Sequence, residues 1–213
     1  MLKDQMDEIY GSTSPDNIPW SFTSPPKLLT GLVKAIVPKR GSIIELGCGI
    51  GNYLIHFAKQ GLPACGVDIS EKAIKVAKNT ALKENVDCKF YVADVLENLS
   101  MINDKFDFAY DWELLHHIFP ENREKYIRNF YALLKPNASY LSVSFSEESA
   151  QFGGIGKFRE TPLGTTLYFS NESEIKKLFK EYFVIQDLKT IDIMGKHVLH
   201  KAIYALMTKK TSQ

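Results

Sequence analysis

The chain has 213 residues, of which 45% are hydrophobic and 24% charged, with a formal net charge of +1. This length is typical of one domain around one core, so residues 1–213 are expected to form a single unit. The near-neutral charge gives no overall basic field for nucleic acid or an anionic membrane. Three cysteines without metal-ligand spacing favour a reducing cytoplasm over a disulfide framework, and no apolar stretch approaches the roughly 20 residues that cross a bilayer.

Residues 1–26 combine turn formers and prolines with two aromatic side chains, which predicts an N-terminal arm that lies on the domain. Helix-like and strand-like segments then alternate along the chain. The expected helices cover residues 27–37, 52–61, 71–85, 121–136 and 173–179. The expected strands cover residues 42–46, 63–70, 88–95, 106–112, 139–145, 183–191 and 201–207. This order predicts an α/β fold with a mostly parallel seven-stranded sheet, helices on both faces and an antiparallel edge strand.

The stretch IELGCGIGN, residues 44–52, places three glycines between the first strand and the next helix. In doubly wound sheets this turn lies at the carboxyl ends of the strands, where ligands bind. Glu45 precedes the turn, Asp68 ends the second strand and Asp94 ends the third, so three acids are expected at one edge of the sheet. An acid about 20 residues after such a turn suits ribose hydroxyls. Glycines also form tight turns that hold no ligand.

A dinucleotide-binding turn would carry GxGxxG, whereas here the spacing is GxGxG and Asn52 stands in the place of the third glycine. The segments ELGCGIGNY, GVDIS, VADVLE and FDFAYDWELLHHI resemble the successive motifs of class I S-adenosylmethionine-dependent methyltransferases, which have a Rossmann-like sheet. IPWSFTSPPKLL and RETPLGTTLYFSNESEI resemble the thiopurine and thiol methyltransferase-like branch. Trp112 stands where thiopurine-type enzymes usually carry an arginine, which argues against thiopurine-like substrates.

The resemblance implies S-adenosylmethionine as cofactor and S-adenosylhomocysteine as product. It implies that Asp68 binds the ribose hydroxyls, that Ile69 and Asp94 contact the adenine, and that Asp111 lies near the methionine amino group. Trp20 would cover the cofactor. The remaining implied cofactor residues are Gly47, Cys48, Gly49, Gly51 and Val95.

Methyl transfer from a sulfonium is an in-line displacement, so alignment of donor and acceptor matters more than an acid. A base is needed only when the acceptor is protonated at the working pH. His116 and His117 are the candidate bases, although packing roles are equally compatible with imidazole. Because neighbouring helix residues point in different directions, at most one is expected to face the site. Other histidines, His56, His197 and His200, are expected to be structural or exposed, and none completes a metal site.

Residues 146–169 form a glycine-rich stretch that is long enough to be a functional loop, and we expect it to act as a lid that excludes water. Anchoring of its aromatic side chains to the core is the alternative. Arg159 in this loop is expected to pair with an anionic acceptor or with a nearby acid. The predicted substrate contacts are Trp112, Phe152, Arg159 and Tyr168.

The predicted function is S-adenosylmethionine-dependent methyl transfer (EC 2.1.1 class) to a small-molecule acceptor, with a thiol or another soft nucleophile as one candidate. A nicotinamide-dependent oxidoreductase is the alternative enzyme, disfavoured by Asn52. A cofactor-binding module without catalysis would carry the same motifs. No basic stripe supports methylation of nucleic acid, and a monomer or weak dimer is expected.

Overall fold

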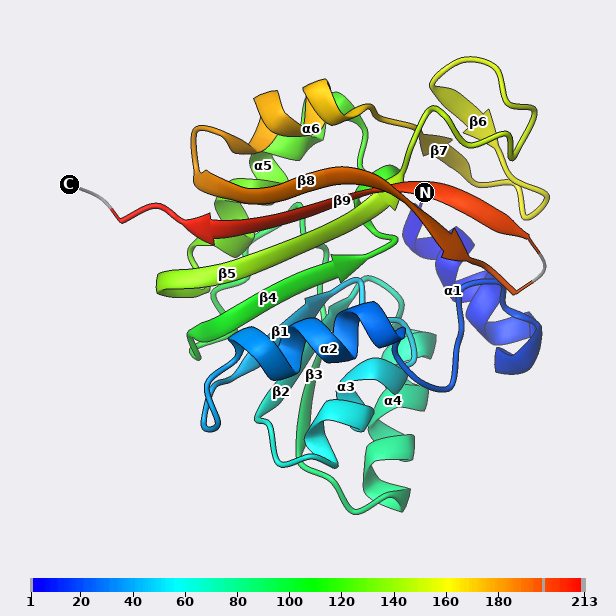
Figure 1. Cartoon of the computed structure of the whole chain (residues 1–213). Coiled ribbons are helices and arrows are strands. Elements are labelled where there is room, and N and C mark those ends of the chain that lie inside the picture. Colours follow the sequence, from blue (N-terminus) through cyan, green and yellow to red (C-terminus); the bar gives the residue numbers. More distant parts are fainter. Residues whose placement is uncertain (1, 197, 212–213) are drawn as a thin grey trace.

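The structure is a computed structural model that describes residues 2–196 and 198–211. Its centre is a seven-stranded sheet with the strand order β3-β2-β1-β4-β5-β9-β8 (Figure 1). The strands of this sheet are β1 (Ile43–Leu46), β2 (Ala64–Asp68), β3 (Cys88–Val92), β4 (Phe106–Trp112), β5 (Leu134–Phe145), β8 (Phe183–Met194) and β9 (Leu199–Lys209). β1 pairs in parallel with both β2 and β4, so the strand order reverses at β1. Such a reversal opens a crevice at the carboxyl ends of the strands.

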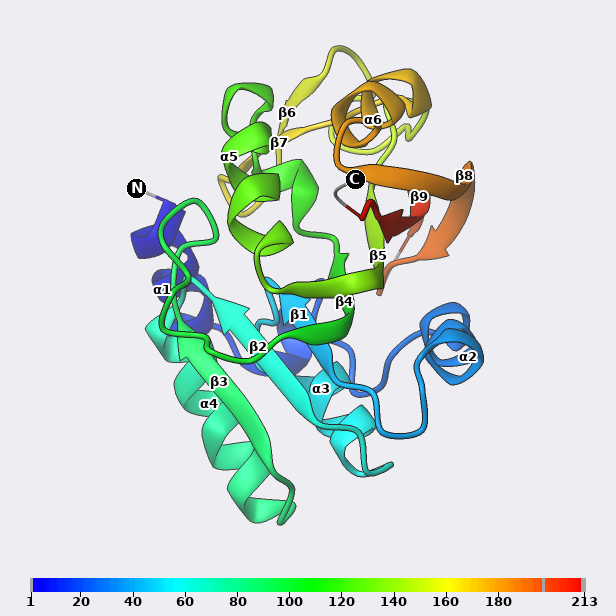
Figure 2. The same cartoon turned by 90° about the vertical axis from the view of Figure 1, so that its left-hand side faces the viewer.

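Helices cover both faces of the sheet (Figure 2). They are α2 (Lys27–Ile36), α3 (Asn52–Ala58) and α4 (Glu71–Lys83) on one face, and α5 (Pro120–Tyr131) and α6 (Glu172–Phe179) on the other. The sheet separates two buried clusters, because alternate residues of β1 such as Ile43 and Ile44 enter opposite ones. The predicted α/β fold is confirmed.

One predicted helix is shorter in the structure, while the antiparallel part of the sheet lies where it was expected. The helix expected over residues 121–136 ends at Tyr131, because Leu134 already pairs with Phe106 in the sheet. The antiparallel part lies at the expected edge: β9 runs antiparallel to β5 and to β8, and β8 is the outermost strand.

The N-terminal arm contains a helix, α1 (Leu2–Ser12), and a short 3-10 helix, η1 (Pro15–Asn17), neither of which we predicted. Met6, Ile9 and Ile18 form a small buried cluster that also contacts Ile69 after β2. Asp7 accepts a 2.6 Å hydrogen bond from the hydroxyl of Ser70, the residue that caps α4. These contacts hold α1 beyond the arrowheads of β4 and β5 (Figure 1).

The stretch over residues 146–169 is not a simple loop. It contains a two-stranded antiparallel hairpin, β6 (Phe158–Glu160) and β7 (Thr166–Tyr168), which stands above the sheet (Figure 1). The carboxyl end of this hairpin joins the core through Phe169, which is fully buried.

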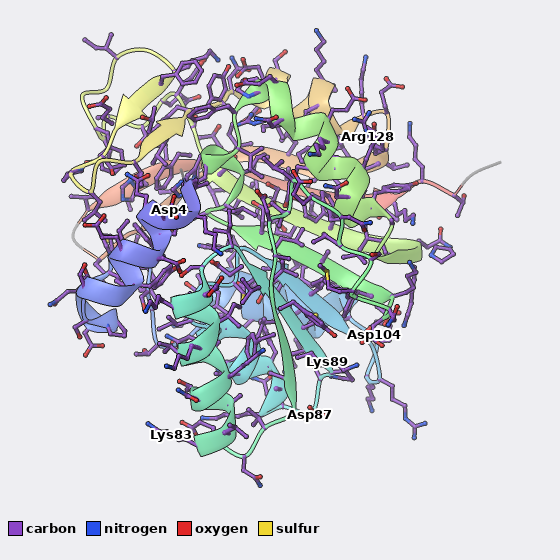
Figure 3. The ribbon with its side chains drawn as sticks, turned by 180° about the vertical axis from the view of Figure 1, so that it is seen from behind. Asp4, Lys83, Asp87, Lys89, Asp104 and Arg128 are labelled. Carbon is purple, nitrogen blue, oxygen red and sulfur yellow. The ribbon has the colours of Figure 1, made fainter. Side chains whose placement is uncertain are left out.

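Acidic and basic side chains both occur on the face seen in Figure 3, for example Asp87, Lys83 and Arg128. One ion pair joins Lys89 Nζ and Asp104 Oδ2, 2.6 Å apart and about half exposed on both sides. Exposed pairs of this kind contribute little to stability, so the two buried clusters carry most of it. In the part of the chain that the structure describes, no helix has the length and apolar character that crossing a membrane requires.

Candidate active site

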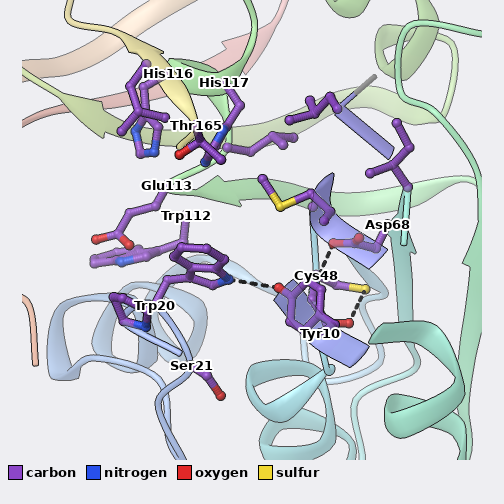
Figure 4. A pocket seen from close by; sticks show the side chains of 18 of the residues that line it. Tyr10, Trp20, Ser21, Cys48, Asp68, Trp112, Glu113, His116, His117 and Thr165 are labelled. Atoms are coloured by element: carbon purple, nitrogen blue, oxygen red, sulfur yellow. Dashed lines mark hydrogen bonds between the residues drawn. The ribbon is translucent and has the colours of Figure 1, made fainter. Parts of the chain in front are cut away.

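A cavity of about 810 Å³ lies at the carboxyl ends of the central strands, under α1, the β6–β7 turn and the β8–β9 hairpin. This volume is in the upper part of the range for small-molecule sites, and therefore leaves room for a cofactor and a second molecule. The predicted site residues that line it are Trp20, Glu45, Gly47, Cys48, Gly49, Asp68, Ile69, Asp94, Val95, Trp112, His116, His117 and Phe152. Figure 4 shows ten of the lining side chains by name.

Two glycines of the turn after β1 have no room for a side chain, for different reasons. A Cβ atom at Gly49, which has a φ of +53°, would lie 2.8 Å from the Tyr10 hydroxyl at the cavity wall. A Cβ atom at Gly51, with a φ of +76°, would instead lie 2.6 Å from the Phe90 ring inside the core. Gly51 does not line the cavity. Its predicted contact with the cofactor is therefore corrected: this glycine lets the start of α3 pack against β3.

Asp68 ends β2 and connects the glycine turn to α4. Its carboxylate accepts hydrogen bonds from the Gly49 N–H at 2.7 Å and from the Ser70 N–H at 2.9 Å. Burial raises the pKa of Asp68 above its ordinary value, although these hydrogen bonds oppose the shift. The side chain faces the cavity beside Cys48 (Figure 4), and its oxygens have acceptor capacity left for further donors.

Glu45 is the penultimate residue of β1, which is buried along its whole length, and is itself only 4% exposed. Its Oε2 atom has no hydrogen-bond partner among the described residues, and burial raises the pKa of this carboxyl well above its ordinary value. Burying an acid without a hydrogen-bond partner costs free energy unless a ligand or a water molecule supplies the missing hydrogen bond. After β3, Asp94 accepts a 2.8 Å hydrogen bond from the Leu96 N–H and lines the cavity beside Val95.

The structure does not bring Asp111 into the cavity. Its carboxylate is fully buried and accepts hydrogen bonds from the hydroxyls of Tyr126, Tyr140 and Ser142. Burial raises the pKa of Asp111 to about 6, against the effect of these bonds. The predicted contact of Asp111 with the methionine amino group is therefore wrong: the side chain serves the core between β4 and α5.

Glu113, two residues later, lines the cavity and was not predicted. Its backbone has a φ of +68°, in the left-handed region that non-glycine residues rarely adopt. The sequence shows this acidic residue directly after the fourth strand, but we assigned the contact with the methionine amino group to Asp111 instead. Burial raises the pKa of Glu113 to about 7.

Both neighbouring histidines line the cavity, so the expectation that only one would do so is wrong. They lie in a 3-10 helix, η2 (Leu115–His117), with ring centroids 4.8 Å apart. His116 Nδ1 accepts a 3.4 Å hydrogen bond from the Phe145 N–H. The His116 and Phe145 rings stack with their centroids 4.2 Å apart. Burial lowers the pKa of His116 well below its ordinary value and that of His117 to about 4, so both rings are neutral at pH 7.

His200, expected to be structural or exposed, is a further cavity residue. It is buried on β9 and stacks on Phe145 with centroids 4.7 Å apart. His56 is partly exposed and lies 2.7 Å from the Gln60 side chain, away from the cavity. The expectation for His197 falls outside the described residues.

Two of the predicted substrate residues have other partners. The Arg159 guanidinium donates to backbone oxygens of residues 147, 149, 151 and 156 and lies 4.0 Å from the Phe169 ring centroid. The Tyr168 hydroxyl donates to Glu174 at 2.9 Å. Neither residue lines the cavity. Both predicted substrate contacts are therefore wrong, and these side chains hold the 146–169 segment together.

The arm supplies a wall of the cavity through two aromatic side chains. Trp20, which we predicted to cover the cofactor, lines the cavity, and its indole N–H donates to the Tyr10 hydroxyl at 2.8 Å (Figure 4). Tyr10 and Met6 on α1 also line the cavity. Sequence reasoning missed them because it did not predict the helix.

Arg123 on α5 holds the histidine turn in place. Its guanidinium donates to the carbonyl oxygens of Ile118 at 2.7 Å and Leu115 at 3.2 Å, on both sides of the histidine pair. A third hydrogen bond, 2.7 Å long, reaches Ser170 after β7. The orientation of both imidazoles thus depends on a buried cation outside the cavity.

Comparison with known proteins gives consistent matches. A family model described as a methyltransferase domain matches residues 43–137. The chain is 25% identical over 193 residues to 2-heptyl-1-hydroxyquinolin-4(1H)-one methyltransferase of Mycobacteroides abscessus, covering 88% of this chain and 79% of that protein. It is 28% identical over 179 residues to ubiquinone biosynthesis O-methyltransferase of Coxiella burnetii, covering 81% and 74%.

Among solved structures, 1,6-didemethyltoxoflavin-N1-methyltransferase of Burkholderia thailandensis, bound to S-adenosylhomocysteine, has a TM-score of 0.76. The two chains are 20% identical, and the match covers 99% of this chain and 88% of that one, which shows the shared fold. These matches favour methyl transfer over the nicotinamide-dependent alternative. Together with the glycine turn and the acids at the strand ends, they indicate an S-adenosylmethionine-dependent methyltransferase (EC 2.1.1).

Proposed function

We propose that this enzyme transfers the methyl group of S-adenosylmethionine to a hydroxyl or ring N–H of a small, planar, largely apolar molecule. The observation that carries the proposal is an aromatic wall next to the strand-end acids in one cavity. Trp112, Phe145 and Phe152 line it together with the neutral rings of His116 and His117. Flat aromatic side chains favour flat ligands through offset or edge contacts.

The cofactor fits the acidic half of the cavity. The orphaned Oε2 of Glu45 is suited to the ammonium of the methionine part, and the bare backbone at Gly49 allows close approach. Asp68 would accept from the ribose hydroxyls, and Ile69 and Val95 would pack on the adenine. The bound cofactor supplies an electrophilic methyl group on a positively charged sulfur.

The acceptor would lie against the histidine turn. Because Nδ1 of His116 accepts the Phe145 N–H, its neutral ring carries the proton on Nε2 and donates from there. That donor orients an acceptor oxygen or nitrogen without charging the site. Alignment is the main requirement of this displacement, so a fixed donor and a flat wall account for most of the catalysis that we assign to these residues.

The similar proteins support a planar acceptor, since the names of two of them refer to heterocyclic compounds, a hydroxyquinolinone and a didemethyltoxoflavin. A thiol is the second candidate acceptor. It is favoured by the many apolar side chains around the histidines, such as Leu114, Ile118 and Leu167, which would suit a polarisable sulfur.

The test is the rate of S-adenosylhomocysteine formation with matched acceptors: a hydroxyquinolinone, its O-methyl ether and an aryl thiol. Trp112→Ala and the surface variant His56→Ala are assayed in parallel. We expect turnover of the hydroxyl compound, none of the ether, and a raised KM for Trp112→Ala alone. Turnover of the thiol only would favour the second candidate, and no product with any acceptor would favour a non-catalytic cofactor-binding module.

A further inference from the structure

Building on the proposed function, we infer that Glu113 is the proton acceptor of the reaction, a catalytic role that the neighbouring histidines do not fill. Three observations concern this residue: its backbone is strained, its side chain lines the cavity, and its carboxylate has no hydrogen-bond or ion-pair partner among the described residues. In Figure 4 the Glu113 side chain lies beside Trp112 on the side of His116, across the cavity from Asp68.

The backbone of Glu113 has an energetically unfavourable conformation that the surrounding structure imposes. A left-handed conformation at a non-glycine residue costs about 1–2 kcal/mol. The Glu113 N–H donates a 2.8 Å hydrogen bond to the carbonyl of Val143, which fixes this geometry at the end of β4. Strain of this kind persists where the surrounding structure imposes it and gathers at functional sites. Here the turn directs the carboxylate into the cavity, while Asp111 points into the core.

The surroundings of Glu113 leave it able to take up a proton. The titratable groups that line the same cavity come from every surrounding element: Lys3 and Tyr10 on α1, Glu45 on β1, Cys48 in the glycine turn, Tyr53 on α3, Asp68 on β2, Asp94 after β3, His116 and His117 on η2, Lys196 after β8 and His200 on β9. None of them is an ion-pair partner of Glu113 within 4.0 Å in the described chain. With burial as the dominant influence, the pKa of about 7 places Glu113 near the best value for a general base at neutral pH.

The histidines are poorer proton acceptors. His117, with a pKa of about 4, is a weak base, and Nδ1 of His116 is engaged by a backbone N–H. Glu45 is assigned above to the ammonium of the cofactor. Glu113 is then the remaining carboxylate beside the aromatic wall.

In the proposed methyl transfer, atoms, electrons and charges balance between the acceptor, the cofactor and Glu113. The acceptor oxygen attacks the methyl carbon, the carbon–sulfur bond breaks, and its electron pair stays on sulfur as the neutral thioether. The hydroxyl proton passes to the Glu113 carboxylate. The positive sulfonium and the negative carboxylate are thus neutralised in one turnover, and the proton later leaves to water.

The experiment compares Glu113→Gln with Glu148→Gln, because Glu148 is an exposed glutamate that does not line the cavity. Both are assayed with a hydroxyl acceptor and with an aryl thiol that is already ionised at pH 7, and S-adenosylhomocysteine affinity is measured by calorimetry. We expect Glu113→Gln to lower kcat for the hydroxyl compound by at least about 100-fold, the usual range for a lost general base. The ionised thiol and the product affinity should be unaffected. In wild-type protein, kcat/KM for the hydroxyl acceptor should rise with pH through about 7, and the substitution should remove that rise.

Two outcomes would overturn the assignment while leaving the methyltransferase intact. Weaker S-adenosylhomocysteine binding with normal turnover at saturation would make Glu113 a cofactor residue, and unchanged turnover of the hydroxyl compound would make it a bystander. Should Glu113→Gln fold poorly, Glu113→Gly removes both the carboxylate and the strain and must show the same split between acceptors. Wild-type protein that methylates no acceptor would contradict the proposed function itself.

Discussion

Asp68 provides the sharpest test of the cofactor half of the cavity. The perturbation is Asp68→Ala, with Asp68→Asn as a milder change that keeps one acceptor oxygen. Asp68 is 8% exposed and its carboxylate accepts a 2.7 Å hydrogen bond from the Gly49 N–H, so loss of the carboxylate removes the predicted ribose contact and also loosens the glycine turn.

The expected magnitude follows from the hydrogen bonds lost. A buried acceptor removed from its donors costs about 1–3 kcal/mol, which corresponds to an affinity for S-adenosylhomocysteine about 5- to 150-fold weaker. Asp68→Asn should fall at the low end, since its amide oxygen can still accept from one N–H. The Ser70 N–H also loses its partner, so the free energy of unfolding should fall in the alanine variant.

The assay is titration calorimetry of S-adenosylhomocysteine into folded variants, with the circular dichroism spectrum as the check on folding. Asp104→Ala is the control, because Asp104 is an exposed acid paired with Lys89 and does not line the cavity. A folded Asp68→Ala variant that binds as tightly as wild type would refute the placement of the ribose at the end of β2.

Three further changes test the scaffold. Gly51→Ala should lower the free energy of unfolding in urea by more than Gly61→Ala: both have a positive φ, but only the first would place a Cβ against an aromatic ring, and equal losses would count against this packing. Arg159→Met should lower the melting temperature without changing the preference between anionic and neutral acceptors, and a selective loss of anionic ones would restore the substrate role. Burial alone would raise the pKa of Asp107, but hydrogen bonds from Lys135 and the Ser42 N–H lower it. Asp107 thus stabilises the fold above its unfolded pKa of about 3.9 and loses this contribution as the pH falls. Asp107→Asn should therefore make the free energy of unfolding depend less on pH at acidic pH. An unchanged pH dependence would contradict this.

The fold and the cofactor half of the cavity were predictable because their signals are local. A short apolar run before glycines predicts a buried strand, and an acid at the end of such a run must lie at the carboxyl edge of a parallel sheet. Asp68 and Asp94 follow this logic, and both line the cavity. The order of elements was enough to place them.

The acceptor half depends on tertiary contacts that no local pattern contains. Which of Asp111 and Glu113 faces the cavity is decided by the left-handed turn at Glu113. His200 comes to the cavity because β9 inserts between β5 and β8. The hairpin strands β6 and β7 have three residues each, too few for a period to be recognised. The spacing of Leu2, Met6 and Ile9 was a helical signal for α1, and it could have been used.

The most direct test of the central claim is a calorimetric titration of the purified protein with S-adenosylmethionine, S-adenosylhomocysteine and NAD(H). The account predicts saturable binding of both adenosyl ligands and none of NAD(H). Binding of NAD(H) without either adenosyl ligand would contradict it.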